Sequence, residues 1–491
     1  MRLFDFLRKG TNKIHTENKD MAYKTTKNYC VDLFGVIGAS RMNLEGIISL
    51  FKNAYKENPK LALKILMYSR DPRGGLGERD TFRMIYSYLA KNDPSVAREL
   101  IPYVAIYGRY DDLFCALHSE IDNDIVEYIK KVLDEDLIKV EKGEQTSLLA
   151  KWMPSINTSS KRVVSLARYL ANRLKMSNDE YRKMLSKLRK GVIVENNLRE
   201  KDYTFEYQSL PSCAMHKYRD AFLRNDFKRY TKYLFEINKG EKKVNTDVVY
   251  LYDILKEAYG PWGEIKSLNE TEQLAMQIKW NNYNKVSNLG NTIIVRDGSC
   301  SMTCDNALPL LIANSMAIYF SQLLSGDFKN KFITFSKEPK LVELKSKDLY
   351  GKIIELSKYD DVGNTDISKV YDLLIDAYKE GIDSKDIIER IIIISDMEFD
   401  LCVEGVSSFE NFKERFDELN IEMPEVIFWN VNARRIHFAS DNHQKNIRYI
   451  SGANPQIMNA ILNGENLDNL TFIKEAVNKY DFIDNIDLKE K

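Results

Sequence analysis

The chain has 491 residues, of which 44% are hydrophobic and 29% charged, and its formal net charge is zero. That length is too great for one ordinary core, and the composition is that of a globular protein, so we expect two or three soluble domains. No run approaches the roughly 18 apolar residues of a spanning helix. The N-terminal stretch MRLFDFLRKGTNKIHTENKD is too charged for a signal peptide, which predicts a cytoplasmic location.

The zero net charge hides an asymmetry between the two parts of the chain. Residues 1–290 contain 49 Lys and Arg against 38 Asp and Glu, whereas residues 291–491 contain 23 against 34. The first part therefore carries 11 excess positive charges, and the second carries 11 excess negative charges. This offset predicts a polyanionic partner for the first part and a cation for the second. Attraction between the two parts across an interface is an alternative, and both can hold.

The first part of the sequence reads as one helix after another. The stretch LEGIISLFKNAYKEN has a helical apolar stripe, and Pro59 and Pro94 stand where helices begin. Further helical stretches follow at short intervals up to about residue 240. Short helices joined by short polar turns predict an α-helical solenoid of HEAT-like repeats without an exact period, over residues 1–285.

Basic residues cluster in and between these helices. Residues 151–200 alone contain 12 basic and 4 acidic residues. A lysine-rich helix is more often a solvated face, but several clusters in one basic region favour RNA contact through phosphate neutralisation, with nearby tyrosines for stacking. The candidate RNA-binding residues are Arg70, Arg73, Arg79, Arg109, Lys161, Arg162, Arg182, Lys183, Lys187, Arg189 and Lys190.

From about Asn291 the pattern changes to strands alternating with helices. NTIIVR, KFITFS, IIERIIIIS and EVIFWNV read as buried strands, and helical stretches separate them. Apolar strands between helices predict a doubly wound, mostly parallel α/β domain over residues 290–480.

Hard-oxygen side chains stand where these strands end. The stretch IIVRDGSCSM ends a strand on Asp297 and continues with Ser299 and Ser301, and IIIISDMEFD ends the most apolar strand on Asp396. Thr365 lies in the glycine-containing loop DDVGNTDISK, just before a helix. Ligand sites lie at the carboxyl ends of such strands, and hard oxygens suit Mg²⁺, Mn²⁺ or Ca²⁺ rather than zinc or copper. The five residues therefore predict a divalent-cation site.

No catalytic apparatus is apparent in the sequence. A phosphatase of the haloacid-dehalogenase type would carry a second Asp at position 299, where this chain has Ser. The stretch DPRGGLGERD lacks the GK[ST] ending of a P-loop. Cys300 and Cys304 form a CxxxC without a second pair, which is not the pattern of a zinc site. We therefore expect a protein that is not an enzyme.

The pattern DGSCS, GNTD and SDME resembles the metal-ion-dependent adhesion site of von Willebrand factor A domains. The resemblance implies that Ser299, Ser301 and Thr365 bind the ion directly, while Asp297 and Asp396 act mainly through water. It also implies an open coordination position for an acidic group of a ligand. Cys300 stands where the family usually has glycine.

A helical solenoid before such a domain is similar to the TROVE architecture of the Ro autoantigen family. The motifs SRDPRGGLGERD, GRYDDL, LAKWMPSINTSSKR and DGSCSM also resemble an uncharacterised family of bacterial, phage and eukaryotic TROVE-like proteins. The likeness covers roughly residues 44–460. The Ro resemblance implies a ring closed by the A domain and the binding of small non-coding or misfolded RNA in a ribonucleoprotein.

Two hypotheses of function follow. The first is a Ro-like RNA-binding protein whose A domain holds Mg²⁺ or Mn²⁺ and which recognises structured RNA or RNA with single-stranded ends. The second is a protein-interaction scaffold, in which the metal site grips an acidic residue of a partner protein. Basic surfaces serve both, so the sequence leaves both open.

Overall fold

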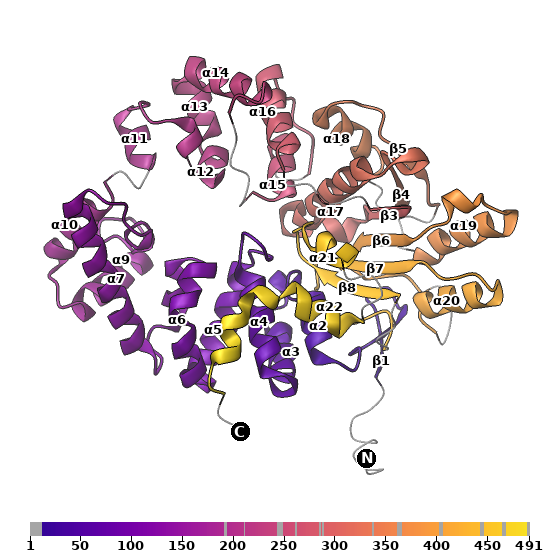
Figure 1. Cartoon of the computed structure of the whole chain (residues 1–491), viewed down its shortest axis with the longest axis horizontal. Helices are drawn as coiled ribbons and strands as arrows, with labels where there is room; N and C mark the ends of the chain where they lie inside the picture. The colour runs from indigo at the N-terminus through magenta and orange to yellow at the C-terminus, as the bar shows by residue number, and fades with distance from the viewer. Residues whose placement is uncertain are drawn as a thin grey trace, which may run out of the picture. The chain divides into compact units, whose positions relative to one another are not determined.

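The computed structural model describes residues 12–488, except 191–193, 211, 243–248, 261–262, 284–285, 287–288, 336–337, 361–365, 402–405, 442–445 and 464–467. A mostly helical region of about 280 residues comes first along the chain, and an α/β region built on a mixed sheet follows (Figure 1). This order confirms the predicted fold class. No helix among the described residues is long and apolar enough to cross a membrane.

The helical region contains short helices joined by short turns. Consecutive helices contact each other, as in the pairs α5–α6, α6–α7, α9–α10 and α13–α14, which is the packing expected of a solenoid. The helices of this region are α2 (Tyr29–Val36), α3 (Leu44–Glu57), α4 (Pro59–Arg70), α5 (Arg79–Asn92), α6 (Pro94–Tyr107), α7 (Asp122–Lys142), α8 (Leu149–Trp152), α9 (Lys161–Arg173), α10 (Asn178–Leu188), α11 (Val194–Glu200), α12 (Ser212–Lys217), α13 (Arg219–Asn225), α14 (Phe227–Asn238), α15 (Leu251–Leu255) and α16 (Glu270–Asn281).

Local sequence signals fix where several of these helices begin. Ser177 accepts a hydrogen bond from the backbone of Glu180 at the start of α10, and the Glu180 side chain accepts one from the Ser177 backbone. The Ser160 side chain accepts from the backbone of Val163 at the start of α9. Such caps satisfy backbone donors that the first helical turn leaves unpaired.

The α/β region is built on a six-stranded sheet in the order β5–β4–β3–β6–β7–β8. All neighbouring pairs are parallel except β4 with β5, which are antiparallel. The strands are β3 (Thr292–Asp297), β4 (Lys331–Phe335), β5 (Leu341–Glu343), β6 (Arg390–Ser395), β7 (Glu425–Asn430) and β8 (Ile447–Ser451). The helices are α17 (Cys304–Leu323), α18 (Leu349–Ser357), α19 (Ile367–Glu380), α20 (Ser408–Glu418), α21 (Ile457–Asn463) and α22 (Asn469–Ala476).

The strand order reverses at the centre of the sheet. The chain moves from β3 to β4 on one side and later places β6 against the other side of β3. Strand β6 is buried along its whole length, and Ile391 to Ile394 are fully inaccessible. The carboxyl ends of β3 and β6 therefore lie side by side at the point where open α/β sheets hold ligands.

A small N-terminal hairpin was not predicted from the sequence. Strands β1 (Lys13–His15) and β2 (Met21–Tyr23) pair antiparallel, and each has only three residues. Tyr23 forms an isolated bridge with Phe438, and Lys19 forms one with Asp400. These contacts attach the hairpin to loops of the α/β region. Strands this short leave no readable period of alternation in the sequence.

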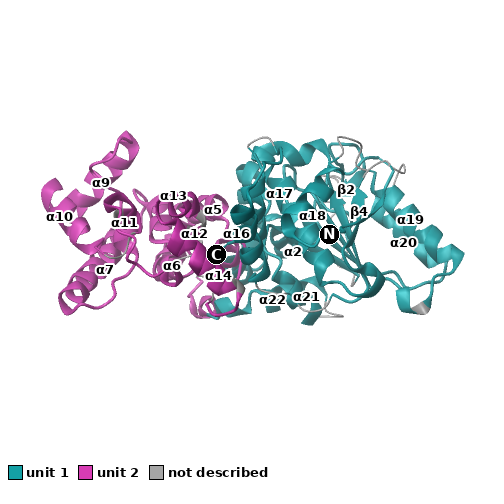
Figure 2. Cartoon of the chain, turned by 90° about the horizontal axis from the view of Figure 1, so that it is seen from above, with its two compact units in different colours: residues 1–65, 246–481 teal, residues 66–245, 482–491 magenta. Residues whose placement is uncertain are grey.

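The chain divides into two compact units that do not follow the change from helix to sheet (Figure 2). Unit 1 contains residues 1–65 and 246–481, and unit 2 contains residues 66–245 and 482–491. Within unit 1, α2 packs against β8 and α22, and α15 packs against α17. The sheet begins at Thr292, and helices from both ends of the helical region share a unit with it, so the domain bounds of 1–285 and 290–480 stay a prediction.

Candidate functional site

The strand-end site lies at the carboxyl ends of β3 and β6 in unit 1. Asp297 is the last residue of β3, and Asp396 directly follows β6. Both carboxylates are buried, with 0% and 1% of the residue exposed. The parallel register, which aligns Arg296 with Ile394, places these two strand ends next to each other. The structure thus brings together two of the predicted metal-binding residues that are 99 positions apart in the sequence.

Hydrogen bonds hold the Asp297 carboxylate in place. Its Oδ1 accepts from the Ser299 backbone at 2.9 Å, and its Oδ2 accepts from the Ser395 hydroxyl at 2.6 Å. Burial, followed by the charge of Asp396, raises the pKa of Asp297 to about 6. Burial also raises the pKa of Asp396. Two buried carboxylates that oppose each other's ionisation form an environment in which a cation would be stabilised.

The two predicted serines complete the described part of the site. The Ser299 and Ser301 hydroxyl oxygens are 3.0 Å apart, so both face the same small volume. Ser299 is buried and Ser301 is partly exposed, which leaves access from solvent. Thr365 lies outside the described residues. The next residue, Asp366, accepts a hydrogen bond from the Ser368 backbone at the start of α19.

The donor set fits a hard divalent cation. Two carboxylates and two hydroxyls supply only oxygen ligands, which Mg²⁺ and Mn²⁺ prefer. In the part of the chain that the structure describes, no group of three His, Cys, Asp or Glu side chains is arranged to hold a metal ion. An ion at this site would therefore depend on the serine hydroxyls and on water as well as on the carboxylates.

A buried arginine stands next to Asp297 in β3 and connects this strand to neighbouring elements. Arg296 precedes Asp297 in β3 and has no exposed surface. Its Nε donates to Asn314 at 2.8 Å, its Nη1 donates to the Tyr359 carbonyl at 2.9 Å, and its Nη2 pairs with Asp360. Burial lowers the pKa of Arg296 to about 10. These contacts attach the residues that directly follow α18 to β3, the strand that carries Asp297.

Arg434 adds a cation to this edge of the sheet. Its Nη2 lies 3.0 Å from Asp396 Oδ2, and its Nη1 lies 2.7 Å from Glu17 Oε2 in the N-terminal hairpin. The sequence did not mark Arg434 as a site residue. Its position just after β7 could have done so, because β7 ends at the same edge of the sheet as β3 and β6.

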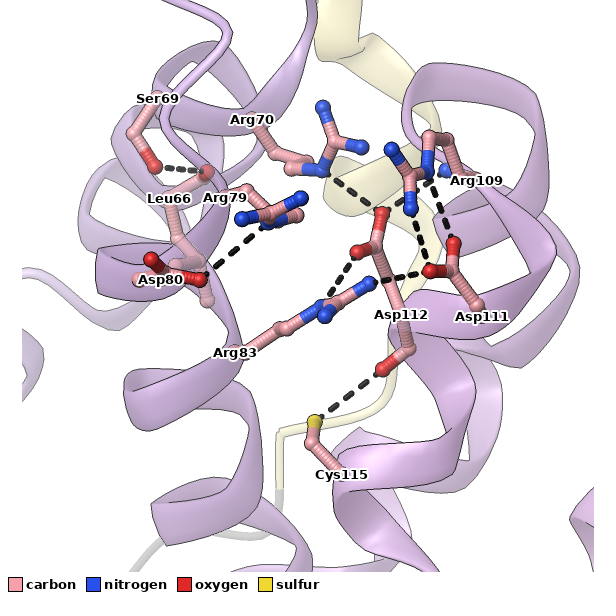
Figure 3. Close-up of polar contacts among 10 residues, drawn as sticks. All are labelled: Leu66, Ser69, Arg70, Arg79, Asp80, Arg83, Arg109, Asp111, Asp112 and Cys115. Carbon is pink, nitrogen blue, oxygen red and sulfur yellow. Dashed lines mark hydrogen bonds and ion pairs between the residues drawn. The ribbon is translucent and has the colours of Figure 1, made fainter. Parts of the chain in front are cut away.

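Two of the predicted RNA-binding arginines, Arg70 and Arg109, are instead part of an ion-pair network around the buried Asp112 in unit 2, together with Arg83 (Figure 3). Arg70 has 3% of its surface exposed, and its Nε donates to Asp112 at 2.7 Å. Arg83 donates to Asp112 at 2.7 Å and to Asp111 at 2.8 Å. Because Arg70 is buried and paired, it is not available as a surface contact for RNA.

Arg109 joins the same network from the GRYDDL turn. Its side chain pairs with Asp111, and its guanidinium carbon lies 3.6 Å above the centre of the Trp152 ring. Gly108 is required beside it, since a Cβ at that position would lie 2.7 Å from Asp112 Oδ2 and 2.8 Å from the Val104 carbonyl. We therefore assign Arg109 primarily to the packing of η2 (Tyr110–Ala116) against α5 and α8.

Arg189 also has a structural position. Its side chain is half-buried and donates to the Ala150 and Met153 carbonyls at 2.8 and 2.7 Å and to the Ser155 hydroxyl at 2.8 Å. Burial lowers the pKa of Arg189. These three bonds attach the end of α10 to α8 and to the turn after it. We therefore assign Arg189 to the packing of these elements rather than to RNA contact.

The remaining basic candidates face solvent. Arg73 is exposed in the turn before α5, and Arg79 is exposed as the first residue of that helix. The other exposed candidates belong to α9 and α10 or directly follow α10: Lys161, Arg162, Arg182, Lys183, Lys187 and Lys190. Several of them form exposed ion pairs, such as Lys183 with Asp179 at 2.7 Å, which are too weak to prevent other contacts.

An open groove of about 380 Å³ lies at the beginning of α9. Two cations line it, Lys161 and Arg168, and neither forms an ion pair among the described residues. Its other lining residues are Thr158, Ser159, Val164 and Ser165. Cations beside hydroxyls and the first turn of a helix form a suitable environment for a phosphate group. Arg168 was not among the residues predicted from the sequence, although its spacing of seven from Lys161 places both on one helix face.

Family models match nearly the whole chain. The model described as "Domain of unknown function (DUF2828)" matches residues 16–107 and 103–291, which together exceed half of the chain. The chain belongs to the DUF2828 family. A second model, "Domain of unknown function (DUF7788)", matches residues 291–489, so the two matches meet where the α/β sheet begins.

Two individual proteins are similar to this DUF2828 chain. One is "Uncharacterized protein L728" of Acanthamoeba polyphaga mimivirus, which is 27% identical over 516 residues, covering 96% of this chain and 88% of the viral protein. The other is the Ro (RSR) protein of Deinococcus radiodurans, whose crystal structure matches with a TM-score of 0.39 and 12% identity. That match covers 87% of this chain and 93% of the Ro chain.

Proposed function

We propose that this protein binds RNA through unit 2, with α9 and α10 as the main contact surface. The groove at the start of α9 is the observation that carries this proposal, because it combines hydroxyls with two cations that form no ion pair among the described residues. The exposed cations of α10 extend the same basic segment. The resemblance of the predicted architecture to that of the Ro family supports RNA as the polyanion, and the excess of 11 positive charges in residues 1–290 supports electrostatic attraction.

We further propose that the strand-end site of the α/β region holds Mg²⁺ or Mn²⁺. Asp297, Ser299, Ser301 and Asp396 are the described residues that would bind it directly or through water, and Thr365 remains the predicted fifth. A bound ion would supply positive charge and an open coordination position for an acidic group. The Asp297 carboxylate is already fixed by hydrogen bonds from the Ser299 backbone and the Ser395 hydroxyl, so it needs little reorganisation to bind an ion.

Charge reversal in the groove tests the RNA proposal. We expect Lys161→Glu with Arg168→Glu to weaken the binding of a fluorescent single-stranded RNA at least about tenfold, because two phosphate contacts become repulsive. The matched control is Lys369→Glu with Lys379→Glu on α19, which changes the net charge equally on exposed positions of the α/β region. Fluorescence anisotropy at fixed salt measures both affinities.

The outcome separates RNA binding from the scaffold hypothesis. Equal weakening by the groove variant and the α19 control would mean that only net charge matters and would remove α9 as the contact. A freshly purified protein without nucleic acid in its absorbance spectrum, and without affinity for RNA, would instead favour a protein partner. Arg189 is left unchanged in these variants, because replacing it would remove the hydrogen bonds that hold the end of α10 and would also change the net charge.

A further inference from the structure

The N-terminal hairpin is attached to the segment that carries Asp396. The Glu17 backbone donates to Glu398 Oε2 at 2.5 Å, and the Asn18 side chain donates to the Glu398 carbonyl at 2.8 Å. The Thr16 hydroxyl donates to the Phe399 carbonyl at 2.6 Å. Residues near the beginning of the chain thus bind Glu398 and Phe399, two and three positions after the proposed metal ligand Asp396.

A chain of three charged side chains runs from this hairpin into the site. Glu17 Oε2 lies 2.7 Å from Arg434 Nη1, and Arg434 Nη2 lies 3.0 Å from Asp396 Oδ2. The exposed fraction of the side chain falls along this series, from 43% for Glu17 to 27% for Arg434 and 0% for Asp396. One guanidinium therefore bridges a solvent-accessible carboxylate and a buried one.

The buried end of this bridge is a carboxylate that a divalent cation would use. Arg434 places a positive charge next to the Asp396 carboxylate, and this charge would repel a divalent cation bound there. Such repulsion is strong where water is largely excluded. Glu17 acts on the same guanidinium from the other side, because it pairs with the second terminal nitrogen and offsets its charge. The two residues should therefore have opposite effects on a cation at Asp396.

We infer that Arg434 is a built-in competitor of the divalent cation for Asp396, and that Glu17 limits how strongly it competes. In the absence of an ion, Arg434 compensates the negative charge of the site. When an ion binds, Arg434 shifts its pairing towards Glu17. This inference rests on the proposed metal site and assigns to the hairpin a role in setting the affinity of that site.

Manganese binding to the full-length protein tests the inference. Free Mn²⁺ is measured by electron paramagnetic resonance during titration at pH 7.5. We expect Arg434→Gln to bind Mn²⁺ at least about threefold more tightly than the wild type, and Glu17→Gln to bind it at least about threefold more weakly, through the change of one charge in each case. Arg434→Lys, which retains the charge but not the second terminal nitrogen, should bind Mn²⁺ with an affinity closer to that of the wild type than Arg434→Gln does.

The opposite signs distinguish this role from simple anchoring. Arg434→Gln and Glu17→Gln break the same ion pair, so a loss of hairpin attachment would shift both affinities in the same direction. Shifts of the same sign, or no shift in either variant, would overturn the inference while leaving the metal site intact. Absence of Mn²⁺ binding in both the wild type and Arg434→Gln would overturn the metal site and the inference together.

Folding controls keep the result interpretable. Glu17 is substantially exposed and its backbone bond to Glu398 does not depend on its carboxylate, so Glu17→Gln should fold as the wild type does. Metal-free thermal melts and circular dichroism verify this for each variant. If Arg434→Gln does not fold, weaker Mn²⁺ binding by Glu17→Gln still supports the inference, and unchanged or tighter binding still overturns it.

Discussion

Asp297 shows how one buried carboxylate can link cation binding to pH. Its pKa is raised to about 6 by burial and by Asp396, so protons compete with a metal ion for it as the pH falls through that value. For a carboxyl with a raised pKa, the metal-free fold gains stability as the pH falls towards the unfolded value near 4. The metal-bound fold shows the opposite trend, because binding needs the ionised form.

We therefore expect the increase in melting temperature caused by millimolar Mg²⁺ or Mn²⁺ to be larger at pH 7.5 than at pH 5.5. Asp297→Ala with Ser299→Ala should abolish this increase at both pH values, since it removes one carboxylate and one hydroxyl from the site. Differential scanning fluorimetry measures the shift. A wild-type protein that folds normally but gains no stability from either ion would show that the site is vestigial.

At the scale of secondary structure elements, the Asp112 network connects α4, α5 and η2. Asp112 is fully buried and accepts from Arg70, Arg83 and the Arg109 backbone at 2.7, 2.7 and 2.8 Å. Breaking a buried pair by removing one partner leaves an uncompensated charge, which typically costs about 3–5 kcal/mol. The network thus holds α4, α5 and η2 in one arrangement.

We expect Asp112→Asn to lower the free energy of unfolding by about 3 kcal/mol or more, because Arg70 would remain buried without its counter-ion. Urea denaturation followed by circular dichroism measures the change. The control is Asp80→Asn, which breaks the exposed pair with Arg79 at 3.2 Å and should cost less than about 1 kcal/mol. Similar losses in both variants would contradict a special role for the buried network.

The sequence predicted local and periodic features well. The run of isoleucines in β6 marked a buried strand, and the strand-end rule then placed Asp396 beside Asp297. It could not distinguish buried from exposed arginines, because Arg70 and its partner Asp112 are 42 residues apart. The attachment of the N-terminal hairpin was missed for the same reason, since the Glu17 backbone donates to Glu398, which lies 381 residues away. Long-range pairing leaves no local pattern to read.

At the scale of the whole molecule, the prediction concerns the kind of RNA that is bound. The Ro resemblance implies a ring closed by the A domain, and ring closure remains a prediction here. A ring would admit strands and ends more easily than an A-form duplex, which is roughly 20 Å wide, and sequence-specific RNA recognition favours single strands in any case. The acidic α/β region should contribute little to this preference.

We therefore expect an RNA with a free single-stranded end to bind more tightly than a blunt duplex of the same length. Competition binding with tailed and blunt RNAs measures the ratio, and both affinities should fall steeply as salt rises, since phosphate contacts release counterions. Tighter binding of the blunt duplex would rule out threading through a ring. It would favour an open helical surface that grips the side of the RNA.

The division of unit 1 into two distant parts of the chain has a consequence for biosynthesis. Helix α2 packs against β8, and the Gly38 backbone donates to the Ser451 hydroxyl across 413 residues. During synthesis, the face of α2 that is buried in the folded protein therefore has no packing partner until β8 has been translated. At about 5–20 residues per second, that delay is on the order of 20–80 seconds. Unit 2 lies almost entirely within this interval, so it can fold while the nascent N-terminal segment still exposes its apolar side chains to chaperones.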